Sequence, residues 1–319
     1  MVSRLIAADD RGMAWPLIDP TGHSDDAAAS PRGALDELLS ASLAWLGSNL
    51  HFFPGNTKAT IELALLNHFW ARSRPADRRL EEVSRLLSQV WRDPGFREQI
   101  FALPHHAYVS ELAYAGLAPA GARVTPGEPP RTPPRHEHAD LPAEHLAFLR
   151  LEARYYADLA GVAQSAVPYS ELYRPTVLGS RVSVRDISDD DAYLVTHIAF
   201  YLGDFGARVP PLGLGDVDHA AAVVAGLLER CVRCGHNWDL ASELVLAQYC
   251  LGRDPLRTRG GRDAIVGLAA TQLADGSLPG RTPARQLGLP TPDGFRYRYH
   301  PTLVATLMAA LVSARPPVT

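Results

Sequence analysis

Three adjacent aspartates stand where the chain enters a long apolar segment, in Asp189-Asp190-Asp191-Ala-Tyr-Leu-Val. Carboxyl groups so close together raise one another's pKa, which is the property that a general acid needs near neutral pH. Aspartate is also favoured at the first positions of a helix, where it caps free N–H groups. The sequence therefore predicts that Asp190 and Asp191 act as proton donors or cation ligands, or that they simply cap a helix.

A second candidate is a polar stripe on the same apolar segment. Tyr193, His197 and Tyr201 are spaced four residues apart and share one face of a helix, while Ile198 and Phe200 lie between them. A polar stripe on an otherwise apolar helix indicates the wall of a cavity, and imidazole is the usual acid and base of enzymes. The alternative is a core histidine that bonds a backbone carbonyl.

A third candidate is a cluster of metal-ligand types. His236 directly precedes a helical segment in which Asp239 and Glu243 share a face, and His300 begins a later apolar segment. Imidazole and carboxylate together form mixed sites for zinc or another divalent ion. The metal ligands expected are Asp239 and His300, with His236 or His197 as the third. In that case the metal polarises an oxygen or activates a thiol or water. The alternatives are a cap for Asp239 and a tertiary hydrogen bond for Glu243.

Taken together, these patterns define one catalytic set. It comprises Asp190, Asp191, Tyr193, His197 and Glu243.

The elements that carry these residues are predicted to be helices. Apolar residues recur with helical spacing in most of the chain, and no stretch alternates between apolar and polar residues long enough for a strand. The fold class expected is therefore all-α. The helical segments expected are 34–47, 56–70, 78–91, 105–118, 143–162, 189–206, 217–235, 237–252, 262–273 and 299–314.

The order of these segments predicts their arrangement. Apolar segments that begin near 56, 105, 189, 237 and 299 are separated by more amphipathic ones, with a spacing of about 50 residues for two of the intervals. A helix that is apolar all round needs burial on both sides, whereas an amphipathic helix needs only one covered face. Alternation of inner and outer helices predicts an α/α toroid over 34–319, with an irregular arm over 1–33 and a Pro-rich loop over 119–142. Polar residues in the first turns of inner helices, Lys58 and Glu62 among them, are expected to face the central cavity.

Two short motifs resemble a known superfamily. The segment Gln272-Leu-Ala-Asp275-Gly276-Ser277-Leu-Pro-Gly280 is similar to the QxxDGSxxG turn of terpenoid cyclases and protein prenyltransferases, and Tyr299-His300-Pro301 is similar to the start of an inner helix in prenyltransferase β subunits. The resemblance covers about residues 185–315. It implies an α/α toroid and a zinc-binding role for His300, with Asp239 in the position of a second ligand.

The chain departs from both families in the residues that carry their chemistry. Asn237-Trp238-Asp239 lacks the cysteine of the Asp-x-Cys segment that supplies zinc ligands in prenyltransferases. The acidic stretch from Asp186 to Asp191 does not have the DxDD spacing of terpenoid cyclases. The resemblance therefore implies the fold more strongly than either activity.

The composition of the chain excludes several classes of protein. The chain has 319 residues, of which 46% are hydrophobic, and a formal net charge of −4, which excludes global disorder and a basic nucleic-acid-binding surface. Three cysteines are too few for a disulfide framework. The N-terminus lacks the apolar core of a signal peptide, and no run reaches the ~18 apolar residues of a membrane span. We therefore expect a cytoplasmic protein with no membrane span.

These observations predict an enzyme with its active site in a central cavity. Lys58 is the only lysine, and the abundance of Arg, Ala, Gly and Pro is typical of a GC-rich bacterial genome, which suggests a role in secondary metabolism. The substrate expected is a small apolar or peptide-like molecule, and the chemistry is Lewis-acid catalysis by a divalent metal or acid catalysis by aspartate. The alternative is a non-catalytic toroid that binds a peptide or a partner protein.

Overall fold

The computed structural model describes residues 30–102, 107–122, 141–162, 167–235, 237–280 and 292–314. Every regular element among these residues is a helix, which confirms the all-α prediction. The elements are α1 (Pro31–Ser48), η1 (Leu50–Gly55), α2 (Thr57–Ser73), α3 (Glu81–Val90), α4 (Pro94–Phe101), α5 (Ala107–Gly116), α6 (Ala143–Leu159), α7 (Tyr169–Tyr173), α8 (Asp189–Gly203), η2 (Asp204–Gly206), α9 (Leu214–Cys234), α10 (Trp238–Cys250), α11 (Arg259–Thr271) and α12 (Pro292–Ala314).

The two segments expected to be irregular lie mostly outside the described residues. The N-terminal arm ends earlier than predicted, because α1 begins at Pro31 rather than at Ala34. Ser30 caps this helix by accepting a hydrogen bond from Gly33 N, and proline at the first helical position needs no hydrogen-bond partner for its nitrogen. Of the Pro-rich loop 119–142, the structure describes only its two ends, and these are not helical.

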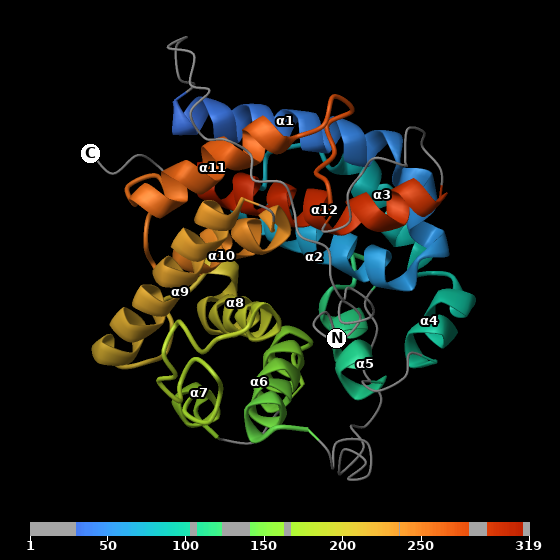
Figure 1. Cartoon of the computed structure of the whole chain (residues 1–319). Coiled ribbons are helices and arrows are strands. Elements are labelled where there is room, and N and C mark those ends of the chain that lie inside the picture. Colours follow the sequence, from blue (N-terminus) through green and yellow to red (C-terminus); the bar gives the residue numbers. More distant parts are fainter. Residues whose placement is uncertain are drawn as a thin grey trace.

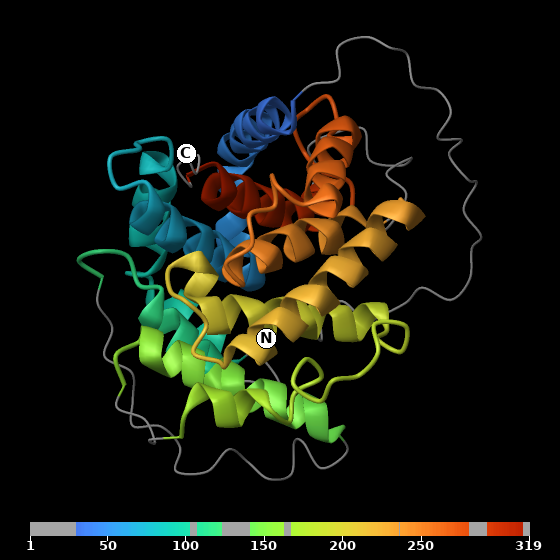
Figure 2. The same ribbon diagram turned by 90° about the vertical axis from the view of Figure 1, so that its left-hand side faces the viewer.

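Seven helices contact one another in a sequence that returns to its start (Figure 1). Helix α10 packs between α8 and α12, α12 packs against α2, and α8 packs against α6. From α6 the contacts continue to α5, then to α4 and back to α2. Helices α1, α11 and α9 form a second row that covers α12 and α10, as Figure 2 shows for α1 (blue) and α11 (orange) beside α12 (red).

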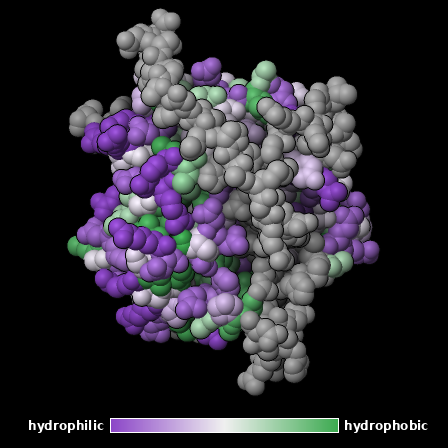
Figure 3. Space-filling view, viewed as in Figure 1, coloured by the Kyte–Doolittle hydropathy of each residue, from purple (hydrophilic) through white to green (hydrophobic). Residues whose placement is uncertain are grey.

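The two rows differ in how much of each helix is buried. Helices α8 and α10 are buried on nearly every side and include buried polar residues, among them Thr196, His197 and Glu243. Helices α9 and α11 bury only one face, as amphipathic helices do. In the described part of the face seen in Figure 3, hydrophilic side chains predominate and hydrophobic ones form small separate areas. None of the described helices is both long enough and apolar enough to span a membrane.

The turn between α11 and α12 ties three helices together. Gln272 Nε2 donates hydrogen bonds to Leu38 O and Ser42 Oγ of α1 and to Gly276 O of its own turn. Leu278 N donates to Thr302 Oγ1 of α12. The QxxDGS motif is therefore a structural junction, in which the Gln272 side chain joins the turn to α1 and the backbone of Leu278 joins it to α12.

Helix α12 begins earlier than the sequence predicts. The sequence places Pro301 in the first helical turn, but α12 starts at Pro292 and Pro301 lies inside it. The added turns are stabilised by aromatic packing, since the ring of Phe295 lies 6.0 Å from that of Trp45 and 4.9 Å from that of Phe53. This tertiary packing offsets the hydrogen bond that proline removes from a helix interior.

Candidate functional site

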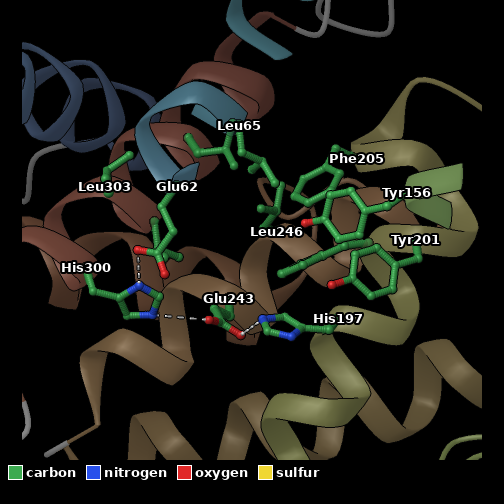
Figure 4. A pocket seen from close by; sticks show the side chains of 13 residues that line it. Glu62, Leu65, Tyr156, His197, Tyr201, Phe205, Glu243, Leu246, His300 and Leu303 are labelled. Atoms are coloured by element: carbon green, nitrogen blue, oxygen red, sulfur yellow. Dashed lines mark hydrogen bonds and ion pairs between the residues drawn. The ribbon is translucent and has the colours of Figure 1, made fainter. Parts of the chain in front are cut away.

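A cavity lies between α2, α6, α8, α10 and α12 (Figure 4). Its empty volume is about 520 Å³, the open mouth included. It is lined by Glu62, Leu65, Tyr156, His197, Phe200, Tyr201, Phe205, Glu243, Leu246, His300, Leu303, Val304 and Leu307. Only four of these side chains are ionisable near neutral pH, and Figure 4 shows them together at one side of the cavity.

These four residues, Glu62, His197, Glu243 and His300, come from four different helices and alternate in charge type. His300 Nδ1 lies 2.8 Å from Glu62 Oε2 in a hydrogen bond, and His300 Nε2 lies 3.8 Å from Glu243 Oε1. On the other side of Glu243, Oε2 lies 3.7 Å from His197 Nε2. The result is a row of acid, imidazole, acid and imidazole, which we call the four-residue cluster.

A set of neighbouring residues holds the cluster in place. Thr196 donates a 2.5 Å hydrogen bond to Glu243 Oε2, and Lys58 Nζ lies 3.7 Å from Glu62 Oε1. Asp239 Oδ1 lies 3.7 Å from His300 Nε2. Tyr193 in turn donates to Asp239 Oδ2 at 2.9 Å. Charged groups buried in this way are stable only when such partners surround them.

The electrostatics of the cluster follow from these contacts. Burial raises the pKa of Glu243, but the imidazoles of His197 and His300 outweigh it and lower the pKa to about 2. Burial likewise opposes ionisation of Glu62, yet His300 and Lys58 lower its pKa. Burial lowers the pKa of His300, but the carboxylates of Glu62, Asp239 and Glu243 raise it well above its ordinary value. The cluster therefore holds ionised carboxylates around an imidazolium.

This charge pattern predicts a pH dependence of stability. A raised pKa in the folded state means that His300 contributes fully below its ordinary pKa of 6.5 and that the contribution is lost as pH rises through the folded pKa. The lowered pKa of Glu243 gives stability above 4.5 that is lost as pH falls towards about 2. We expect His300→Gln to destabilise the protein most between pH 4.5 and pH 6.5 and less at higher pH. The loss in the free energy of unfolding should be about 1.4 kcal/mol for each unit by which the pKa of His300 is raised in the folded protein.

The measurement is urea unfolding of the wild type and His300→Gln across the pH range. His51→Gln is the matched control, because His51 is exposed and lies outside the cavity. Equal pH dependence in the two variants would contradict the ion pairs assigned to His300.

The remainder of the cavity is apolar and aromatic. Tyr201 donates a 2.8 Å hydrogen bond to Glu152 Oε1, and burial together with that carboxylate raises the pKa of Tyr201 well above its ordinary value. Burial also raises the pKa of Tyr156. Both phenols therefore stay neutral and act as hydrogen-bonding groups in an apolar wall. Phe205 reaches the cavity from a turn with a left-handed backbone, at φ 51°.

The structure brings most of the predicted catalytic and metal residues into one place. His197, Glu243 and His300 line the cavity, and Asp239 and Tyr193 stand directly behind them. The polar stripe on α8 does reach the cavity, through His197 and Tyr201.

Asp190 and Asp191 lie elsewhere. Asp190 is exposed, and Asp191 Oδ2 accepts a 2.7 Å hydrogen bond from Ser188 Oγ at the start of α8 while its Oδ1 lies 3.6 Å from His145 Nε2. Neither aspartate lines the cavity, and Asp191 is about 9 Å along the helix from His197. Ser188 is the residue that caps α8, and both aspartates lie in the first turn, where carboxylates stabilise the helix; they take no part in the function that we propose.

Several residues in and around the four-residue cluster have little or no signal in the sequence. Glu62 and Lys58 are expected to face the cavity, but nothing in the chain points to a bond between Glu62 and His300, which are 238 positions apart. Thr196 and Glu152 are not predicted at all. A threonine inside an apolar helix and a glutamate inside an amphipathic helix are both common, so neither pattern singles them out.

Of the residues predicted to hold a metal ion, the structure describes Asp239 and His300 but not His236. Among the residues that the structure describes, no group of three or more His, Cys, Asp or Glu is arranged to hold a metal ion. Asp239 and His300 approach each other, but His236 lies outside the described residues. The metal stays a prediction.

Comparison with known proteins gives one family. No curated protein and no solved structure matches the chain. The family described as a domain of unknown function (DUF6895) matches residues 39–310, a stretch that includes every residue lining the cavity. Because this match covers most of the sequence, the chain belongs to the DUF6895 family.

Proposed function

We propose that this protein is an enzyme that binds a small, largely apolar molecule in the cavity and transfers a proton to or from it. One observation carries the proposal. Four ionisable side chains from four helices converge at one side of a cavity that is otherwise apolar and aromatic. Buried charge is costly to maintain, and clusters of this kind are concentrated at functional sites.

In this proposal His197 is the catalytic residue. It lines the cavity, and Glu243 Oε2 lies 3.7 Å from its Nε2, so the carboxylate stabilises the imidazolium that forms when the ring takes a proton. The side chains of Thr196 and His300 fix the position of Glu243 from two sides. Glu62 in turn holds His300 through a hydrogen bond, and Lys58 is ion-paired with Glu62. An imidazole oriented and stabilised by a carboxylate is a recurring arrangement in acid–base catalysis.

The architecture that we propose for this site is an α/α toroid. The closed order of contacts from α2 through α12, α10, α8, α6, α5 and α4 supports it, as does the second row formed by α1, α11 and α9. The cavity would then lie at the axis of the inner row. The resemblance to terpenoid cyclases and prenyltransferases is consistent with this arrangement, and the proposed setting in bacterial secondary metabolism rests on the composition alone.

The alternative is a non-catalytic protein that binds a peptide or a partner protein. Such a protein does not need acid and base groups that converge, and side chains scattered over several sites would have favoured it. The convergence of His197, Glu243 and His300 favours the enzyme.

The test is an untargeted turnover screen. Wild-type protein is incubated in D₂O with the small-molecule fraction of a bacterial extract, and mass spectrometry records metabolites that change in mass or amount. We expect at least one such metabolite with the wild type and with Glu98→Gln, a control on the exposed face of α4, and none with His197→Asn. A screen in which the wild type changes no metabolite would overturn the proposal and leave the binding alternative.

A further inference from the structure

The cavity has a polar side and an apolar side. On α12, His300 is followed three, four and seven positions later by Leu303, Val304 and Leu307, so the apolar lining extends about 10 Å beyond the imidazole. The same order recurs on α2, from Glu62 to Leu65, and on α10, from Glu243 to Leu246. Figure 4 shows the three leucines Leu65, Leu246 and Leu303 on one side of their charged neighbours. A ligand that fills this space has one polar end and an apolar body.

The charge at the polar side does not suit an anion. Among the described residues there, Glu62, Asp239 and Glu243 are carboxylates, and Lys58 is the one side chain with a permanent positive charge. With both imidazoles neutral the net charge is −2, and with both protonated it is zero. No protonation state of His197 and His300 makes this side of the cavity positive. A carboxylate or phosphate ligand therefore gains no net attraction, whereas a cation is attracted whenever at least one of the two imidazoles is neutral.

One carboxylate oxygen is available to such a cation. Glu62 Oε1 is buried and accepts no hydrogen bond, since Lys58 Nζ is 3.7 Å away. A buried acceptor without a donor costs free energy, so an N–H group of a ligand at this position would be stabilised.

We infer that the ligand of this cavity is an amphiphilic amine, whose protonated amino group binds at Glu62 and Glu243 and whose apolar body extends along Leu303 and Leu307 towards Phe205. The inference rests on the proposed function, because it assigns the substrate class of the same site. An ammonium group beside His197 can give up a proton to the imidazole, which leaves the neutral amine and an imidazolium that faces Glu243.

The experiment is calorimetric titration with matched probes. Hexylamine, 1-hexanol and hexanoate share one chain and differ only in the head group, and the series from butylamine to octylamine varies the chain. We expect hexylamine to bind the wild type at least about tenfold more tightly than hexanoate, with 1-hexanol between them. Affinity should rise by up to about fourfold for each added methylene until the chain exceeds the apolar depth.

The variants test the head-group site. Glu62→Gln should weaken hexylamine binding about tenfold and leave 1-hexanol nearly unchanged, whereas Glu98→Gln should change neither. The inference is overturned if hexanoate binds as tightly as hexylamine. It is also overturned if no amine binds with a dissociation constant of about 1 mM or lower. If Glu62→Gln fails to fold, the comparison of hexylamine with hexanoate on the wild type still decides it.

The proposed enzyme activity and the inferred amine site can be contradicted independently of each other. Amine binding without any metabolite turned over in the D₂O screen contradicts the enzyme and supports the amine site. Turnover of an anionic substrate that depends on His197 supports the enzyme and contradicts the amine site.

Discussion

Replacing Gly276 by alanine should lower the free energy of unfolding by about 3–5 kcal/mol, because the added methyl group meets both backbone strain and a steric clash. Gly276 has φ +87°, a conformation that costs an L-residue about 1–2 kcal/mol. A Cβ atom there would also lie 2.3 Å from the carbonyl oxygen of Ala41. That oxygen belongs to the middle of α1, so it cannot move unless the helix moves away from the turn that Gln272 holds against it.

Two other glycines separate the backbone strain from the steric clash. Gly252 has φ +78°, and a Cβ atom added there would have nothing within 4 Å, so Gly252→Ala should cost only the strain, about 1–2 kcal/mol. Gly215 lies in α9 with open space around it, and Gly215→Ala should be neutral or stabilise by about 0.5 kcal/mol. Urea unfolding followed by circular dichroism ranks the three variants. The junction assigned to Gly276 is wrong if Gly276→Ala is no less stable than Gly252→Ala.

The second large effect concerns activity. We expect Glu243→Gln to lower the rate of the reaction found in the D₂O screen by about 10²–10⁴-fold. Glutamine has the size of glutamate and can still accept the hydrogen bond from Thr196, so the geometry is preserved. The variant removes the negative charge that faces His197 at 3.7 Å and His300 at 3.8 Å. Without that charge, the imidazolium of His197 loses its stabilising partner.

A graded control distinguishes charge from position. Thr196→Ser keeps the hydroxyl that donates to Glu243 and should retain most of the activity. Glu243→Gln should also bring the pKa of His300 closer to its ordinary value, because one of the carboxylates that raises it is gone. Histidine resonances in a ¹H–¹⁵N NMR titration report this change without any substrate. A variant with the wild-type rate would remove Glu243 from the mechanism.

Much of the secondary structure could be predicted because its causes are local. The repeat of apolar residues every three to four positions identifies α8, α9, α10 and α11, and glycines such as Gly235 mark where a helix ends. The short helices α4 and α7 were not predicted, because eight and five residues carry too little periodicity to stand out. The early start of α12 depends on rings of α1 and η1, which the sequence near Phe295 cannot reveal.

The candidate site could also be predicted only in part. Spacing alone placed Tyr193, His197 and Tyr201 on one helical face, because all three lie on the same helix. It did the same for Asp239 and Glu243 on another helix. Asp190 and Asp191 had the more obvious acidic pattern, yet that pattern has two physical causes, and residue type alone cannot separate an acid catalyst from a helix cap.

By itself, then, the sequence determined that this protein is built from helices and which faces of those helices carry polar residues, because hydrogen bonding within a helix and burial of its apolar stripe depend on near neighbours in the chain. Only the tertiary structure decided which of those faces meet. Glu62 and His300 are 238 positions apart, and Thr196 and Glu243 are 47 apart, yet each pair is hydrogen-bonded. Such pairings follow from the packing of whole helices, which no short segment of the chain contains.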